Sequence, residues 1–103
     1  MHLSGARVVA WMEFTRRREG MIHALEGGLW FHRHTLRGEP MAHLVSSDRD
    51  LLLAAGELLE LRPDWLQHKP LKFPPTGKRI EAWHWDLRGI FLQRALALAL
   101  PRR

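Results

Sequence analysis

The chain contains no cysteine among its 103 residues. This absence excludes disulfide bonds, thiolate metal sites and cysteine nucleophiles, so His, Asp and Glu must supply any set of metal ligands. No stretch approaches the roughly 20 consecutive apolar residues of a membrane span. The N-terminal MHLSGARVV also lacks the long apolar region of a secretory signal. We therefore expect a soluble, cytoplasmic protein.

Asparagine is also absent, glutamine occurs twice, and only Lys69, Lys72 and Lys78 are lysines among the sixteen basic residues. A scarcity of thermolabile Asn, Gln and Cys fits a thermophilic source, although GC-rich coding produces the same bias toward arginine. The formal net charge of +5 favours a polyanionic partner over a cationic one.

With 46% apolar residues, the chain fits a single domain, residues 1–103, with one core. Alternating or short apolar runs predict strands over 7–15, 21–25, 29–36, 41–46 and 80–85. The intervening segments 16–20, 26–28 and 37–40 are typical of turns. A meander is the economical arrangement of the first four strands.

The second half of the chain predicts two main helices. Ser47 is expected to cap the first, whose buried stripe runs from Leu51 to Leu59, and Pro63 begins a short helical turn. Residues 69–78 are typical of an irregular loop, and residues 86–100 predict the last helix. Its final turns, Ala95 to Leu100, are apolar on every side, which indicates burial in the core or against a second copy of the chain.

Together these elements predict an α+β fold. We expect a mixed or mainly antiparallel sheet of about four to five strands, with the two main helices packed on one face.

Two blocks of sequence hold the polar groups best suited to chemistry, His43 with Asp48 and His84 with Asp86. If strands 41–46 and 80–85 are parallel neighbours, both Asp side chains lie at helix N-termini near one end of the sheet. There the histidines could act as general acid or base and the carboxylates as ligands of a metal or water. The alternative is structural, because an Asp at a helix start is more often a cap.

These blocks resemble the bacterial domain-of-unknown-function 4031 family over Gly28 to about Pro101. Its members share a His-Leu-(Val/Ala)-(Ser/Ala)-Asp motif after a strand, then a helix, a Trp or Phe, and a His-Tyr-Asp motif before the last helix. The matching residues are His43-Leu44-Val45-Ser46 with Asp48 after one extra serine, helix 51–61, Trp65-Leu66-Gln67 and His84-Trp85-Asp86-Leu87.

The chain departs from that family in three places. Trp85 replaces the usual tyrosine, Phe31-His32-Arg33-His34 stands where members often have acidic residues, and residues 1–27 have no counterpart. Some relatives are joined to an HD-type phosphohydrolase domain, so the resemblance implies a loose association with phosphate chemistry.

The chain has seven histidines, and three of them could gather on one face of a sheet. If residues 37–40 form a hairpin loop, His34 faces His43, and His32 shares their face. Such an imidazole cluster is a candidate site for zinc, copper, nickel or iron. A register shift by one residue would scatter the set, and solvated or hydrogen-bonded histidines are the plainer alternative.

Basic residues are concentrated in one turn and one loop: Arg16, Arg17, Arg18, Lys69, Lys72, Lys78 and Arg79. Candidate rings for base stacking are Trp30, Trp83, Trp85 and Phe73. This charge favours a phosphate-bearing ligand or nucleic acid, although no recognised nucleic-acid motif frames these residues and arginine-rich turns are usually solvated surface.

Three functions therefore remain open. The working hypothesis is a small binding or accessory module for a phosphate-bearing ligand or nucleic acid. The second is a metal-dependent hydrolase that uses His43, Asp48, His84 and Asp86. The third is a homodimeric interaction protein that associates through Ala95 to Leu100. The observation that would best discriminate among these three functions is whether His43 and His84 lie close together in space.

Overall fold

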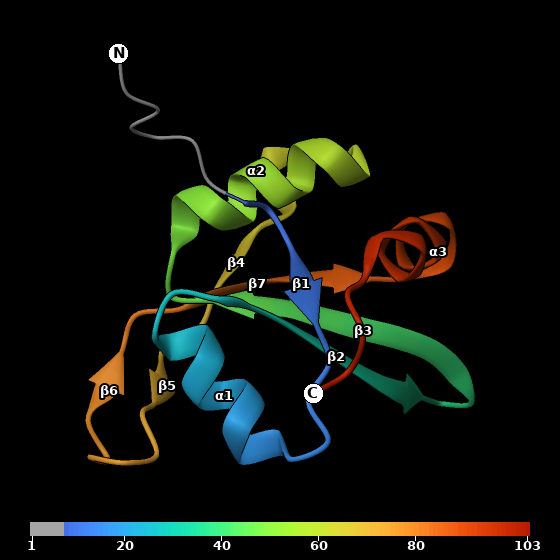
Figure 1. The fold of residues 1–103 in the computed structure, drawn as a ribbon. Helices are drawn as coiled ribbons and strands as arrows, with labels where there is room; N and C mark the ends of the chain where they lie inside the picture. The colour runs from blue at the N-terminus through green and yellow to red at the C-terminus, as the bar shows by residue number, and fades with distance from the viewer. Residues whose placement is uncertain (1–7) are drawn as a thin grey trace.

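The computed structural model describes residues 8–103, which form three helices, a five-stranded sheet and a small two-stranded sheet (Figure 1). The helices are α1 (Arg17–Leu25), α2 (Arg49–Leu59) and α3 (Gly89–Leu98), with a 3-10 helix at Pro63–Trp65. The strands are β1 (Trp11–Met12), β2 (Leu29–Leu36), β3 (Glu39–Ser46), β4 (Gln67–His68), β5 (Leu71–Lys72), β6 (Arg79–Ile80) and β7 (Trp83–Leu87).

The large sheet has the strand order β1-β2-β3-β7-β4. β1 is parallel to β2 and every other neighbouring pair is antiparallel, so the sheet is mixed. This arrangement confirms the predicted α+β class.

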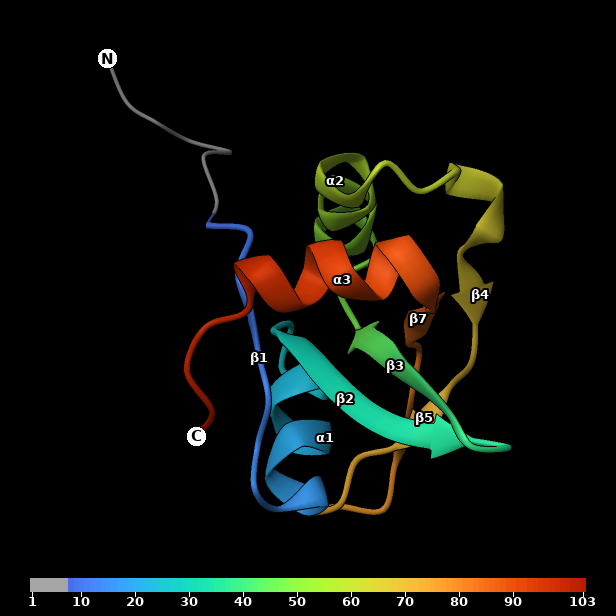
Figure 2. The same cartoon turned by 90° about the vertical axis from the view of Figure 1, so that its right-hand side faces the viewer.

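The two faces of the large sheet are covered to different extents (Figures 1 and 2). α2 and α3 lie on one face, where Phe31, Leu44 and Trp85 are buried in the main core. Two main helices on one face were predicted. α1 and the β5–β6 hairpin lie on the other face, and there a smaller buried cluster contains Trp30 and Val45. The polar side chains of that face include His32, His43, His84 and Asp86.

The segment before β2 differs most from the prediction. Residues 17–20 of the segment predicted as a turn and residues 21–25, predicted as a strand, form the single helix α1. Because α1 connects two parallel strands, the first half of the chain is a β-α-β unit and not a meander. The strand predicted over 7–15 is reduced to Trp11–Met12, and Arg7 lies outside the described residues.

The hairpin between β2 and β3 is tighter than the predicted loop over 37–40. Arg37 and Gly38 form a two-residue turn with φ angles of 52° and 80°, and positive φ at both positions is typical of the turn that suits twisted strands. Pro40 belongs to β3, where it pairs with Thr35 at a position whose nitrogen points away from β2. The register therefore differs from the prediction by two residues, which keeps every side chain on its predicted face.

β3 and β7 are neighbours but antiparallel, so the parallel arrangement on which a joint site of helix N-termini depended is wrong. β7 continues to Leu87, so Asp86 lies inside a strand and α3 begins only at Gly89. The 3-10 helix at Pro63 was predicted, whereas part of the loop predicted over 69–78 pairs as β5 with β6.

The C-terminal segment lies beside β1. The Leu100 N–H donates to the Trp11 carbonyl and the Arg103 N–H to the Glu13 carbonyl, so this edge of the sheet is covered. In the segment predicted to dimerise, Ala95 is buried and its carbonyl accepts a 2.9 Å hydrogen bond from the Trp11 indole, while Leu98 is 53% exposed.

Across residues 8–103 the helices are too short or too polar to cross a membrane.

Candidate metal centre

The strand register brings polar side chains into rows across the partly open face of the sheet. In one row His32 of β2 pairs with His43 of β3, and His43 pairs with Asp86 of β7. Directly paired residues point to the same face with their Cβ atoms roughly 5 Å apart. The pairing of β3 with β7 therefore places the His43 ring beside the Asp86 carboxylate.

The adjacent row adds the remaining members of the site. Val45 of β3 pairs with His84 of β7, and His84 pairs with Gln67 of the short edge strand β4. Since His84 and Asp86 are two residues apart in one strand, their side chains share a face. The site is thus assembled from three strands.

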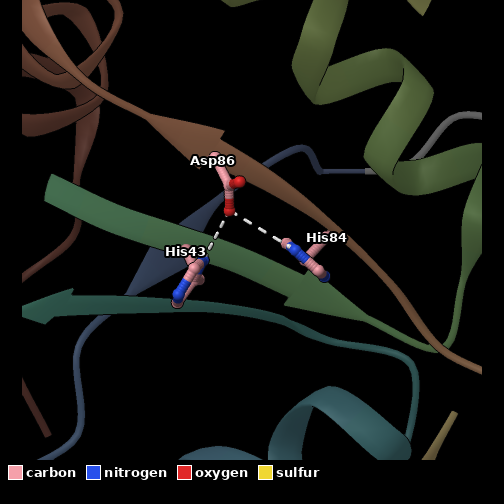
Figure 3. Close-up of side chains that lie close together, drawn as sticks. All are labelled: His43, His84 and Asp86. Atoms are coloured by element: carbon pink, nitrogen blue, oxygen red, sulfur yellow. Dashed lines mark hydrogen bonds and ion pairs between the residues drawn. The ribbon is translucent and has the colours of Figure 1, made fainter. Parts of the chain in front are cut away.

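Asp86 lies at the centre of this group (Figure 3). Its Oδ1 is 2.8 Å from Nδ1 of His43 and 3.4 Å from Nε2 of His84. Gln67 Nε2 donates a 2.8 Å hydrogen bond to the other carboxylate oxygen, Oδ2. Because an ionised carboxylate can only accept, the His43 Nδ1 carries the hydrogen in the metal-free site.

The environment fixes the protonation of these groups. Burial lowers the pKa of both His43 and His84, and the negative charge of Asp86 only partly offsets this effect. Burial raises the pKa of Asp86, but the hydrogen bond from Gln67 and the two imidazoles lower it overall. At neutral pH the site therefore holds neutral imidazoles and an ionised carboxylate, the states in which these side chains bind metals.

The group fits a divalent transition metal. Within residues 8–103, His43, His84 and Asp86 are the set of three whose ligand atoms all lie within 4.8 Å of one another. Ligand atoms bonded at about 2.0–2.2 Å around tetrahedral zinc lie roughly 3.3 Å apart. The 3.4 Å between Asp86 Oδ1 and His84 Nε2 is close to this separation, whereas the 2.8 Å between Asp86 Oδ1 and His43 Nδ1 is a direct hydrogen bond that a bound metal would replace. Two imidazoles and one carboxylate form the donor set of many catalytic zinc and non-haem iron sites.

His32 and His34 extend the imidazole group along β2. Ring centroids are 5.8 Å apart for His32 and His34, 4.7 Å for His34 and His43, and 5.2 Å for His43 and His84. The predicted cluster of His32, His34 and His43 thus shares a face. A role for His32 and His34 as metal ligands stays a prediction, because they lie beside the convergent group.

Asp48 lies at the start of α2, which packs on the opposite face of the sheet. Its carboxylate accepts a 3.0 Å hydrogen bond from the Leu51 N–H, so Asp48, and not the predicted Ser47, is the N-cap. Asp48 and Asp86 were expected to lie close together at two adjacent helix N-termini if β3 and β7 were parallel. They do not, because β3 and β7 run in opposite directions.

A cavity of about 480 Å³ lies against the imidazoles. His32, His34, His43 and His84 line one side of it, together with the sheet residues Trp30 and Val45. Arg17 and Met21 of α1, Lys69, and Leu71 of β5 complete the lining.

The predicted polyanion-binding residues separate into two groups. Arg17 and Lys69 line the cavity, whereas the other five are exposed and lie outside its lining: Arg16, Arg18, Lys72, Lys78 and Arg79. Of the predicted stacking rings, Trp30 and Trp85 are only 3% and 1% exposed. They therefore lack the free faces that base stacking needs.

Gln67 is a site residue to which the sequence assigned no role. It lies in the Trp65-Leu66-Gln67 match to the family resemblance, which was the only signal that could have pointed to it.

No family model matches the chain, and neither a curated protein nor a solved structure matches it. The family resemblance therefore stays a prediction.

Proposed function

We propose that the protein is a metal-dependent hydrolase in which His43, His84 and Asp86 hold one divalent transition metal at the side of the pocket. The observation that carries the proposal is the convergence of these three ligand atoms, with two of the three residues, His43 and His84, lining an open cavity. Structural zinc sites are usually closed by four protein ligands, whereas three ligands leave a position for water or substrate. A three-ligand site facing a cavity therefore favours catalysis over a purely structural role.

The residues of the chain have separate parts in this proposal. Gln67 orients the carboxylate of Asp86, as partners behind metal ligands commonly do. His34 lines the cavity, and its buried Nε2 has no hydrogen-bond partner within residues 8–103. The metal itself would polarise a substrate oxygen and lower the pKa of a water molecule.

Hydrolysis of chromogenic carboxylate and phosphate esters tests the proposal. Purified protein supplied with zinc, manganese, nickel or iron(II) is expected to hydrolyse one substrate class, and a chelator should abolish the activity. His84→Ala should lower kcat/KM at least about 100-fold, because it removes a metal ligand.

His68→Ala is the matched control, since His68 is an exposed histidine of β4 that pairs with Trp83 and stands outside the convergent group. Equal rates for wild type and His84→Ala with every metal would overturn the proposal.

The sequence-based hypothesis of a module that binds a phosphate-bearing ligand keeps support from the same cavity. Arg17 and Lys69 line it, and they bring positive charge to the candidate metal ligands. A homodimer through Ala95 to Leu100 and a cytoplasmic location stay predictions.

A further inference from the structure

Two cations line the pocket, and neither has a carboxylate partner among the described residues. Arg17 projects from α1, and Lys69 lies between β4 and β5. Within residues 8–103 neither forms an ion pair, although four other arginines do: Arg33, Arg62, Arg94 and Arg102. No Asp or Glu is among the described residues that line the cavity. Unpaired cations in a concave site raise the local concentration of anions.

Both cations lie close to the imidazole group. The Arg17 guanidinium carbon is 6.0 Å from the centroid of the Trp30 ring, which stacks on His32 at 4.7 Å. Lys69 lines the same cavity as His43 and His84. An anion bound by Arg17 and Lys69 would therefore lie beside the candidate metal ligands.

We infer that the pocket binds the phosphate group of a small phosphomonoester, held by Arg17 and Lys69 next to the metal. The inference rests on the proposed function and names its substrate class. Two charge-assisted donors from different walls suit a dianion with three terminal oxygens.

The reaction that fits this ligand is hydrolysis of the phosphate ester. A water oxygen forms a bond to phosphorus while the bond from phosphorus to the ester oxygen breaks. One proton of the water goes to the leaving alcohol, and the other stays on the phosphate. The products are the free alcohol and inorganic phosphate.

The shape of the pocket favours a small molecule over a nucleic-acid strand. Its volume of about 480 Å³ falls within the roughly 300–1,000 Å³ of small-molecule sites. Met21, Val45 and Leu71 add apolar lining that suits the carbon skeleton of an alcohol. A strand of nucleic acid would need exposed rings on which bases stack, and Trp30 is buried beneath His32 and Arg17.

Calorimetric titration of the zinc-loaded protein with inorganic phosphate, a product of the proposed reaction, tests the inference. Arg17→Gln and Lys69→Gln are each expected to weaken phosphate binding about tenfold, because each removes a charge-assisted hydrogen bond. Arg49→Gln is the matched control, since Arg49 is exposed on α2, which packs on the opposite face. Zinc stoichiometry should stay the same in all three variants.

The outcomes separate the two proposals. Normal zinc binding without phosphate binding, or equal phosphate affinity in Lys69→Gln and Arg49→Gln, overturns the phosphate inference and leaves the metal site standing. Absence of binding of all four metals, zinc, manganese, nickel and iron(II), overturns the proposed function. Phosphate titration of the metal-free Arg17→Gln and Lys69→Gln proteins then shows whether the two cations form an anion site by themselves.

A single-stranded oligonucleotide supplies the remaining comparison. Two results together would overturn the inference. The oligonucleotide would bind more tightly than phosphate, with a steep salt dependence. Arg16→Gln and Arg79→Gln would also weaken its binding as much as Arg17→Gln does. That result would assign the basic residues to a nucleic-acid surface. Weak binding of the oligonucleotide that none of these variants changes supports the small phosphomonoester.

Discussion

At the scale of single residues, Gln67 determines which oxygen of Asp86 is available. Its amide holds Oδ2, so Oδ1 is left to face both imidazoles. The sequence could indicate His43, His84 and Asp86, because their side chains are suited to metal binding wherever they lie. It could not assign a role to Gln67, whose partner is 19 residues away and depends on β4 adding to the edge beside β7.

Replacing Gln67 by Leu should therefore weaken zinc binding about tenfold without unfolding the protein, since the carboxylate loses the partner that orients it. Calorimetric zinc titration measures the affinity. The second glutamine of the chain, Gln93, is exposed on α3, and Gln93→Leu serves as the control. Identical zinc affinities for the two variants would show that Gln67 has no part in the site.

At the scale of elements, the sequence predicted those segments whose pattern is strong and local. The alternation in 29–36 and the apolar stripe of α2 were sufficient for β2 and for α2. α1 was missed because its nine residues begin with charged side chains and end in a short apolar run that equally suits a strand. The direction of β7 was also beyond the sequence, since parallel and antiparallel strands share the same period of two.

The position of α1 depends on the absence of a side chain at Gly20. A Cβ atom at this position would overlap the ring of Trp30, so Gly20 permits the close approach of α1 to β2. Gly20→Ala improves helix propensity by about 1 kcal/mol. Overpacking against a buried ring costs about 1–3 kcal/mol, which outweighs the gain.

We therefore expect Gly20→Ala to lower the free energy of unfolding in urea by about 1 kcal/mol. Glu19→Ala, at an exposed neighbouring position of α1, is the control and should change stability by less than about 0.5 kcal/mol. A Gly20→Ala protein as stable as wild type would mean that helix and sheet are not in close contact at this point.

At the scale of the whole molecule, burial of histidines links stability to pH. His23, His32, His43 and His84 each have a pKa below the ordinary 6.5, chiefly because burial disfavours the charged ring. The unfolded chain, in which these rings have ordinary pKa values, then binds more protons than the folded protein as the pH falls below that value. Stability must decrease with decreasing pH over this range.

The melting temperature of the metal-free protein should therefore fall between about pH 7 and about pH 5. Burial raises the pKa of Glu13, but its ion pairs with Arg33 and Arg102 lower it overall, and this adds to the fall at the acid end. Scanning calorimetry across this range measures the effect. A melting temperature that is constant or rises on acidification would contradict the lowered pKa values.

The long-range contacts of the fold explain why the site could not be fully predicted from the sequence. Convergence of His43, His84 and Asp86 requires the β3–β7 register, and the pocket requires α1 and Lys69 to lie on the same side of the sheet. Each of these conditions is a long-range contact that no local pattern encodes. The sequence suggested His43, Asp48, His84 and Asp86 as one candidate site, but it could not supply the antiparallel register that joins three of them and leaves Asp48 as a helix cap.

The central claim is a metal centre built from these three side chains, and calorimetric titration of the metal-free protein with zinc tests it most directly. The claim predicts one zinc ion per chain in wild type and in His68→Ala. Zinc binding at this site should be lost in both His84→Ala and Asp86→Ala. Failure of the wild type to bind zinc, or unchanged stoichiometry and affinity in those two variants, would contradict it.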